Sequence, residues 1–144
     1  MEGSTGDTER AMSEENVEVV RRGHETFNRR DLDAYLTSCD PEMEFTPYER
    51  AVEGLGPYRG HDDVRRWWKE AFDTLPDFRV ELSETRDLGE LVLVHGSLRG
   101  HGAGSGASFE RDYWGLFRCC NGRVVWWRAF ESETEALEAA GLSE

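Results

Sequence analysis

The chain has 144 residues, of which 38% are hydrophobic and 33% charged, as is usual for one soluble globular domain. Acidic residues outnumber basic ones by 30 to 17, which gives a formal net charge of -13 at pH 7. This charge repels phosphate backbones and anionic lipid surfaces, so neither nucleic acid nor a membrane is an expected partner. No apolar run approaches the roughly 20 residues of a membrane-spanning helix, and no signal-peptide pattern opens the sequence, so we expect a cytoplasmic protein.

The three cysteines give no sign of a disulfide framework. Cys39, Cys119 and Cys120 are odd in number and have no C-x-x-C spacing. Neighbouring side chains of a strand point to opposite faces, so Cys119 and Cys120 are not expected to bridge each other. We predict reduced thiols.

The N-terminal third of the sequence predicts a tail and two helices. Residues 1–12 are rich in Gly, Ser, Thr and acids, and we predict a disordered tail there, with the folded domain over 13–144. Ser13, followed by two glutamates, has the character of a helix cap, and Asp31 is typical of a second one. The first helix carries an apolar stripe at helical spacing: Val17, Val20, His24 and Phe27.

The middle of the chain predicts one strand, a loop, a helix and two longer strands. A short strand over 42–46 is followed by a loop over 47–57 with two prolines and two glycines, which we expect to border a cavity mouth. A third helix over 62–75 ends at a proline. Residues 78–87 and 91–99 alternate as strands do.

The segment from Phe109 to Glu144 predicts a hairpin that continues into a terminal helix. Asn121-Gly122 between two aromatic-rich runs is the strongest short-range hairpin signal. Ser132 followed by Glu135 has capping-box spacing, and Gly141 suits a left-handed helix stop. The glycine-rich stretch over 100–106 joins two strands and precedes no helix, which favours a flexible hairpin tip over a phosphate-binding loop.

This order of elements, together with four short motifs, resembles the SnoaL-like branch of the nuclear transport factor 2-like superfamily. The motifs are Asp31-Leu-Asp-Ala34, Tyr58-Arg-Gly-His-Asp62, Gly122-Arg-Val-Val125 and Glu135-Ala-Leu-Glu-Ala-Ala-Gly-Leu142. The resemblance implies an α+β fold, a cone-shaped half-barrel of a curved mixed sheet packed on three N-terminal helices, with a short C-terminal helix. It also implies an apolar pocket between sheet and helices, and dimerisation through the outer sheet face.

Two activities of the superfamily lack their residues in this chain. The tyrosine, aspartate base and aspartic acid donor of ketosteroid isomerase align with Gly23, Thr46 and Tyr113, so the proton-abstracting carboxylate is missing. Limonene epoxide hydrolase needs an arginine between two carboxylates with a tyrosine and an asparagine. The corresponding positions hold His95, Ser97, Ala129, Glu44 and Thr46.

Strand alternation, aligned with the family, predicts the polar groups that face the pocket. His95 is the candidate general acid or base, since an imidazole titrates near neutrality. Arg111 would hold an anionic or enolate oxygen, Tyr113 would donate to it, and Glu131 would orient or pair with either. The alternative is that these four groups satisfy one another in a polar core without chemistry.

The remaining pocket positions are predicted to be largely aromatic. Adjacent tryptophans face different directions, so one member of each pair is expected to line the pocket. The histidines show no spacing typical of metal ligands, and no metal or organic cofactor is expected. The predicted lining residues are His24, Phe27, Thr46, Trp67, Trp68, Arg99 and Trp127.

Two functions remain open from the sequence. One is an enzyme that cyclises, isomerises or hydrates a small apolar or aromatic substrate by acid–base chemistry without a cofactor. The other is a non-catalytic ligand-binding or interaction module. In both, we expect a homodimer through the sheet face that carries Trp126, Arg128 and Phe130, because so aromatic a face is unusual on a monomer.

Overall fold

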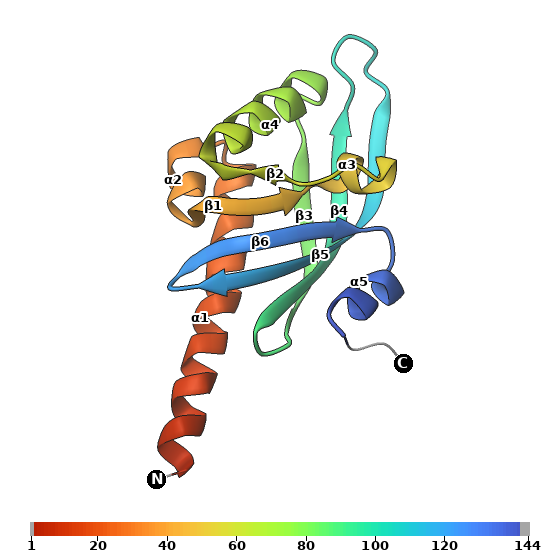
Figure 1. Ribbon diagram of the computed structural model, residues 1–144. Helices are drawn as coiled ribbons and strands as arrows, with labels where there is room; N and C mark the ends of the chain where they lie inside the picture. Colours follow the sequence, from red (N-terminus) through yellow and green to blue (C-terminus); the bar gives the residue numbers. More distant parts are fainter. Residues whose placement is uncertain (1, 142–144) are drawn as a thin grey trace.

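The computed structural model describes the backbone of residues 2–141 and the side chains of residues 13–141. Six strands form a single sheet in the order β2-β1-β6-β5-β4-β3 (Figure 1). The strands are β1 (Cys39–Thr46), β2 (Tyr58–Arg59), β3 (Arg79–Asp87), β4 (Leu91–His101), β5 (Ser108–Cys120) and β6 (Arg123–Phe130). The helices are α1 (Glu2–Asn28), α2 (Leu32–Thr37), α3 (Tyr48–Glu53), α4 (Gly60–Thr74) and α5 (Glu133–Ala139).

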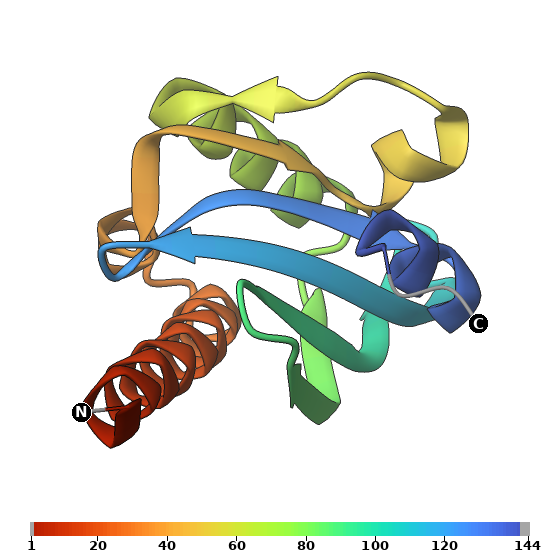
Figure 2. The ribbon, with the colours of Figure 1, turned by 60° about the horizontal axis from the view of Figure 1, so that its bottom comes forward.

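The sheet is mixed and strongly curved. β1 pairs with β6 in parallel, whereas all the other neighbours are antiparallel. Helices α1, α2 and α4 cover the concave face, and the short α5 packs on the other face against β5 and β6 (Figure 2). The α+β half-barrel predicted from the sequence is therefore confirmed, including its three helices on one side and its short terminal helix.

Local sequence signals account for several element boundaries. The Asp31 carboxylate accepts a hydrogen bond from the Ala34 amide at 3.2 Å and caps α2. Ser132 caps α5 in the same way, through the amide of Glu135 at 3.2 Å. Asn121 and Gly122 both have positive φ, 53° and 76°, as the tight turn between β5 and β6 requires.

The structure differs from the sequence prediction at two helices. Helix α1 begins at Glu2 rather than Ser13, so its backbone includes most of the segment predicted to be a disordered tail. Residues 8–12 are mostly fair helix formers, although the sequence has no apolar stripe there to indicate a helix. In the predicted loop over 47–57, residues 48–53 form the single-turn helix α3, which ends at Gly54 in the left-handed region.

The sheet separates two apolar clusters. The larger lies on the concave side, where Met43 and Phe45 of β1 and Val64 of α4 are fully buried. The smaller lies on the outer face beneath α5 and includes Leu93, Trp114, Leu116, Phe130 and Ala136. Part of the aromatic outer face is thus covered by the chain's own last helix.

A β-bulge in β6 changes which residues face the concave side. Cys119 pairs with Val124 and Arg118 with Trp126, so Val125 has no partner across the ladder. As a result Val124 faces the concave side and contributes to its core. Trp127 faces that side as predicted, and Ala129 faces it too.

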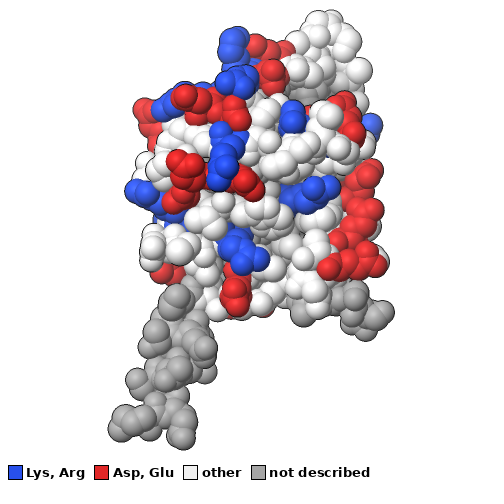
Figure 3. Space-filling view, viewed as in Figure 1, with Lys and Arg blue, Asp and Glu red and all other residues white. Residues whose placement is uncertain are grey.

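Basic and acidic side chains are interspersed on the face seen in Figure 3, and basic residues form no continuous patch there. Arg59, for example, lies within 3.8 Å of carboxylate oxygens of Glu42 and of Glu44. Between residues 2 and 141, no helix has both the length and the apolar character needed to cross a membrane.

Candidate functional site

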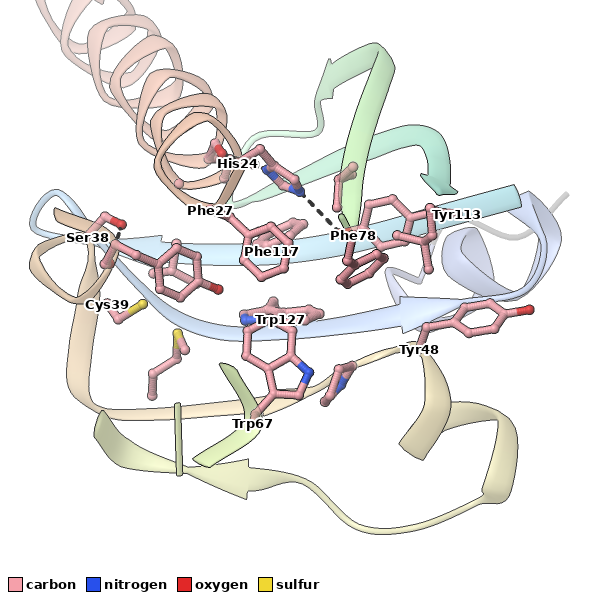
Figure 4. Close-up of a pocket in the computed structure, with 18 of the residues that line it drawn as sticks. His24, Phe27, Ser38, Cys39, Tyr48, Trp67, Phe78, Tyr113, Phe117 and Trp127 are labelled. Atoms are coloured by element: carbon pink, nitrogen blue, oxygen red, sulfur yellow. Dashed lines mark hydrogen bonds between the residues drawn. The ribbon is translucent and has the colours of Figure 1, made fainter. Parts of the chain in front are cut away.

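A cavity of about 70 Å³ lies between the concave face of the sheet and helices α1, α2 and α4 (Figure 4). A cavity of roughly 150 Å³ is enough for benzene, so the space here suits a smaller, compact molecule unless side chains move. Pro47, Tyr48 and Glu49, from the start of α3, line one end of it. Its wall is rich in aromatic side chains: Phe27, Tyr35, Tyr48, Trp67, Phe78, Tyr113, Phe117 and Trp127.

His24 projects from α1 into this wall, and its hydrogen bonds define its tautomer. Its Nδ1 lies 2.8 Å from the carbonyl oxygen of Val20, which only accepts, so Nδ1 carries the proton. Its Nε2 lies 3.3 Å from the hydroxyl oxygen of Tyr113. Burial lowers the pKa of His24, against a smaller opposing effect of the Val20 hydrogen bond. The ring is therefore neutral at pH 7, and Nε2 is a proton acceptor.

Tyr113 comes from β5 and meets His24 across the cavity wall, as the dashed line in Figure 4 shows. Burial raises the pKa of Tyr113 far above its usual value, so its hydroxyl keeps its proton at any physiological pH. Tyr113 is thus a hydrogen-bond donor, and His24 is the base of the pair.

His24 also borders a second, more polar groove on the other side of α1. This groove lies between α1 and β3, and its lining includes Arg21, Glu25, Asn28 and Glu84. The imidazole is half-buried between the apolar cavity and this groove.

Two other ionisable groups line the cavity, and burial raises the pKa of both. Burial raises the pKa of the Cys39 thiol to about 12, so Cys39 is not a thiolate nucleophile at neutral pH. Burial also raises the pKa of Glu49, although a hydrogen bond from the Trp67 side chain partly offsets this. Across the described residues, no group of three or more His, Cys, Asp or Glu side chains is arranged to hold a metal ion.

Of the four predicted catalytic residues, Tyr113 alone lines the cavity. His95 lies on the opposite face of the sheet, where its ring stacks on Trp114 at 3.8 Å and its Nε2 lies 2.9 Å from Asp112. Arg111 is exposed and donates to the carbonyl oxygen of Glu110. Glu131 is exposed beyond the end of β6. The expectation that these four side chains converge in a single cavity is wrong.

The register of β4 explains the error for His95. Gly96, not His95, pairs with Tyr113, and it occupies the concave side, where a Cβ would collide with the carbonyl oxygen of Glu81. The one-residue offset turns His95 and Arg99 to the outer face. The side chains of β4 that face the concave core are those of Val92, Val94 and Leu98.

The predicted lining residues divide in the same way. His24, Phe27, Trp67 and Trp127 line the cavity. Trp68 is buried beside Phe27 and Tyr35, outside the cavity wall.

Two predicted lining residues belong to the other face. Thr46 is buried, but it pairs with Arg128 in the row of Trp126 and Phe130. Arg99 forms ion pairs with Glu81 at 3.2 Å and Glu110 at 3.0 Å.

The sequence analysis did not single out four aromatic residues of the cavity wall: Tyr35, Tyr48, Phe78 and Phe117. Phe117 shares the alternation of Tyr113 along β5, so that pattern was sufficient to find it. Tyr35 lies in helix α2 and Phe78 lies just before β3, so strand alternation gives no direction for either side chain.

Solved structures with this fold place the chain in a class. It is similar to a nuclear transport factor 2-like protein of unknown function from Burkholderia pseudomallei, with 28% identity over 86% of this chain and 95% of the other, at a TM-score of 0.71. It also resembles TerC, crystallised with polyporic acid, at 19% identity, 86% and 96% coverage and a TM-score of 0.71. A protein with a ketosteroid isomerase-like fold from Catenulispora acidiphila, in complex with trimethylamine, matches at 15% identity, 87% and 93% coverage and a TM-score of 0.69. The chain therefore has the nuclear transport factor 2-like fold.

Within that fold class, the SnoaL-like domain matches residues 20–127. This span includes the cavity wall from His24 to Trp127, and the chain belongs to the SnoaL-like family. No match was found among curated proteins.

Proposed function

We propose that this protein is an enzyme that moves a proton on a small, neutral carbonyl compound bound in the cavity. The observation that carries the proposal is the contact between His24 and Tyr113, which places a neutral base 3.3 Å from a protonated hydroxyl in an aromatic cavity. His24 takes the role of general base that the sequence analysis gave to His95, and Tyr113 keeps its predicted role of donor.

The step is proton abstraction next to the carbonyl group. The C–H bond breaks, its proton passes to His24 Nε2, and its electron pair forms the C=C bond of an enolate. The carbonyl oxygen takes the negative charge and accepts a hydrogen bond from the Tyr113 hydroxyl, which turns from His24 towards it. The imidazolium then returns a proton to the same or another atom of the substrate, which isomerises it or prepares it for ring closure.

The lining of the cavity favours a neutral ligand. No Lys or Arg is among the lining residues, and a buried carboxylate without a cation would be costly. The Tyr113 hydroxyl and the Trp127 indole N–H are hydrogen-bond donors, which suit oxygen atoms of a ligand. Relatives crystallised with trimethylamine and with polyporic acid support the view that this fold holds small organic molecules.

Hydrogen exchange tests the proposal without knowledge of the natural substrate. The protein is incubated with butan-2-one in D₂O, and loss of the proton signals next to the carbonyl is followed by NMR. We expect exchange above the buffer rate, and we expect His24→Gln to slow it by at least about 100-fold, the usual lower bound for a general base. Tyr113→Phe should slow exchange while binding of the ketone is retained.

Equal exchange rates for the wild type and His24→Gln would overturn the proposal. Binding of the ketone without any catalysed exchange would instead favour the second candidate function, a non-catalytic ligand-binding module. The observation that favours this alternative is that most of the cavity wall is apolar and contributes shape rather than chemistry.

We further propose that the protein forms a homodimer through the outer face of the sheet. Trp126 lies partly buried beside the apolar cluster under α5, and Arg128 lies over the Phe130 ring at 5.4 Å. These side chains share one face, as the sequence predicted. Phe130 is buried there, and Trp126 stays partly exposed at the edge of the area that α5 covers.

A further inference from the structure

The indole N–H of Trp127 is a buried donor in the cavity wall. Trp127 is 6% exposed, and none of the residues that the structure describes accepts a hydrogen bond from its Nε1. Its side chain lines the cavity, and the nitrogen end of the ring points towards the side formed by Cys39, away from Tyr113 (Figure 4). A buried donor without a partner is destabilising, so its retention in a cavity wall points to a ligand that supplies the acceptor.

The ring of Trp127 is held so that this donor cannot turn elsewhere. Phe45 stacks on it at 5.7 Å and 24°, and Phe117 stacks on it at 5.5 Å and 18°. Trp67 meets it edge-on at 5.9 Å. The N–H direction is therefore fixed before any ligand binds, which is the condition for a hydrogen bond that costs little ordering.

We propose that Trp127 is a specificity-determining residue, whose indole N–H binds a second oxygen of the ligand while Tyr113 binds the first. This inference rests on the proposed function, and it narrows the ligand to a small neutral molecule with two oxygen functions on an apolar frame, such as a hydroxyketone. A ligand with one oxygen leaves one of the two donors unpaired.

The test uses the full chain and four small probes. Hydroxyacetone and 4-hydroxybutan-2-one have two oxygens at different separations, butan-2-one has one, and 2-methylbut-1-ene has none. The chain has five tryptophans, so five indole N–H resonances are observed by ¹⁵N-resolved NMR. On saturation with at least one hydroxyketone, the Trp127 resonance should move downfield, and with 2-methylbut-1-ene it should not. The Trp114 indole, which already donates to Asp112 at 3.2 Å on the outer face, is the internal control and should stay in place.

Affinities give the second measurement. We expect the better hydroxyketone to bind the wild type about tenfold more tightly than butan-2-one, as one additional hydrogen bond allows. Trp127→Phe keeps the aromatic wall and lacks the N–H, so it should bind the hydroxyketone and butan-2-one with about equal affinity. Phe117→Leu changes the same wall without removing a donor, and it should lower both affinities while the preference remains.

The outcomes separate this inference from the proposed function. If butan-2-one binds and exchanges its protons but the Trp127 resonance does not move with either hydroxyketone, the inference is overturned and the proposed function stands. If Trp127→Phe loses affinity equally for all probes, and the Trp127 resonance of the wild type does not move, Trp127 only packs against the ligand. If no probe binds the wild type, both proposals fail.

Discussion

Tyr113 lies along β5 over Gly115, and a methyl group at residue 115 would lie 2.5 Å from the Tyr113 hydroxyl oxygen. The same methyl group would lie 2.9 Å from the Phe117 ring. Gly115 thus leaves the space in which the Tyr113 hydroxyl reaches His24. The position of the donor depends on a residue that has no side chain and no chemistry of its own.

We predict that Gly115→Ala displaces the Tyr113 hydroxyl from His24 and destabilises the fold by about 1–3 kcal/mol, as overpacked cores usually do. Urea denaturation gives the free energy of unfolding. Exchange of butan-2-one protons should fall as it does in Tyr113→Phe. Gly56→Ala is the matched control, because no atom lies within 4 Å of a Cβ there, and its stability should stay close to that of the wild type. A stable, fully active Gly115→Ala protein would contradict the placement of Tyr113.

The protonation of His24 predicts how stability depends on pH. Its pKa is lowered from 6.5 in the folded state, chiefly by burial. As the pH falls through 6.5, the unfolded chain takes up a proton on this residue before the folded chain does, so stability is lost on the acid side and is fully present above it. We expect the free energy of unfolding of the wild type, relative to His24→Gln, to decrease between pH 7.5 and 5. A pH-independent difference between the two proteins would show that His24 titrates normally when folded.

His95 and His24 give a matched pair of variants for the location of the site. His95 stacks on Trp114 and contacts Asp112 on the outer face, whereas His24 lies in the cavity wall. We predict that His95→Gln leaves the proton exchange of butan-2-one within about twofold of the wild type, since surface substitutions usually have small effects. His24→Gln should lose most of the catalysed exchange. If His95→Gln instead slows exchange more than His24→Gln in the same assay, the active site lies on the outer face.

Local signals in the sequence were sufficient for most of the fold. The turn at Asn121-Gly122 and the caps at Asp31 and Ser132 each depend on neighbouring residues only, and each is found where it was predicted. The face of the β5 side chains was also predicted correctly, because strand alternation continues without a break from Tyr113 to Phe117 and places both on the concave side. A signal of this kind needs no knowledge of distant strands.

The face of each strand was harder to predict, because it depends on contacts across the sheet. The face of His95 is set by the pairing of Gly96 with Tyr113 and by the close approach of the β3 backbone to Gly96. The face of Val124 is set by the bulge at Val125. Neither feature leaves a local pattern, and a shift of one residue reverses every side chain beyond it. The sequence therefore placed His95 in a cavity wall that holds His24 instead, although it placed Tyr113 there correctly.

The last prediction concerns assembly through the outer face of the sheet. Helix α5 covers Leu93, Trp114, Leu116 and Phe130, but Trp126 remains only partly buried at the edge of this cluster. We expect light scattering at micromolar concentration to give about twice the 16.5 kDa of the single chain. Trp126→Glu would bury a charge in that interface, so the variant should be largely monomeric while the cavity stays formed. Val52→Glu, at a residue of α3 that is 48% exposed, is the control and should stay dimeric. A monomeric wild type would refute the dimer, and a dimeric Trp126→Glu protein would show that the interface lies on another face.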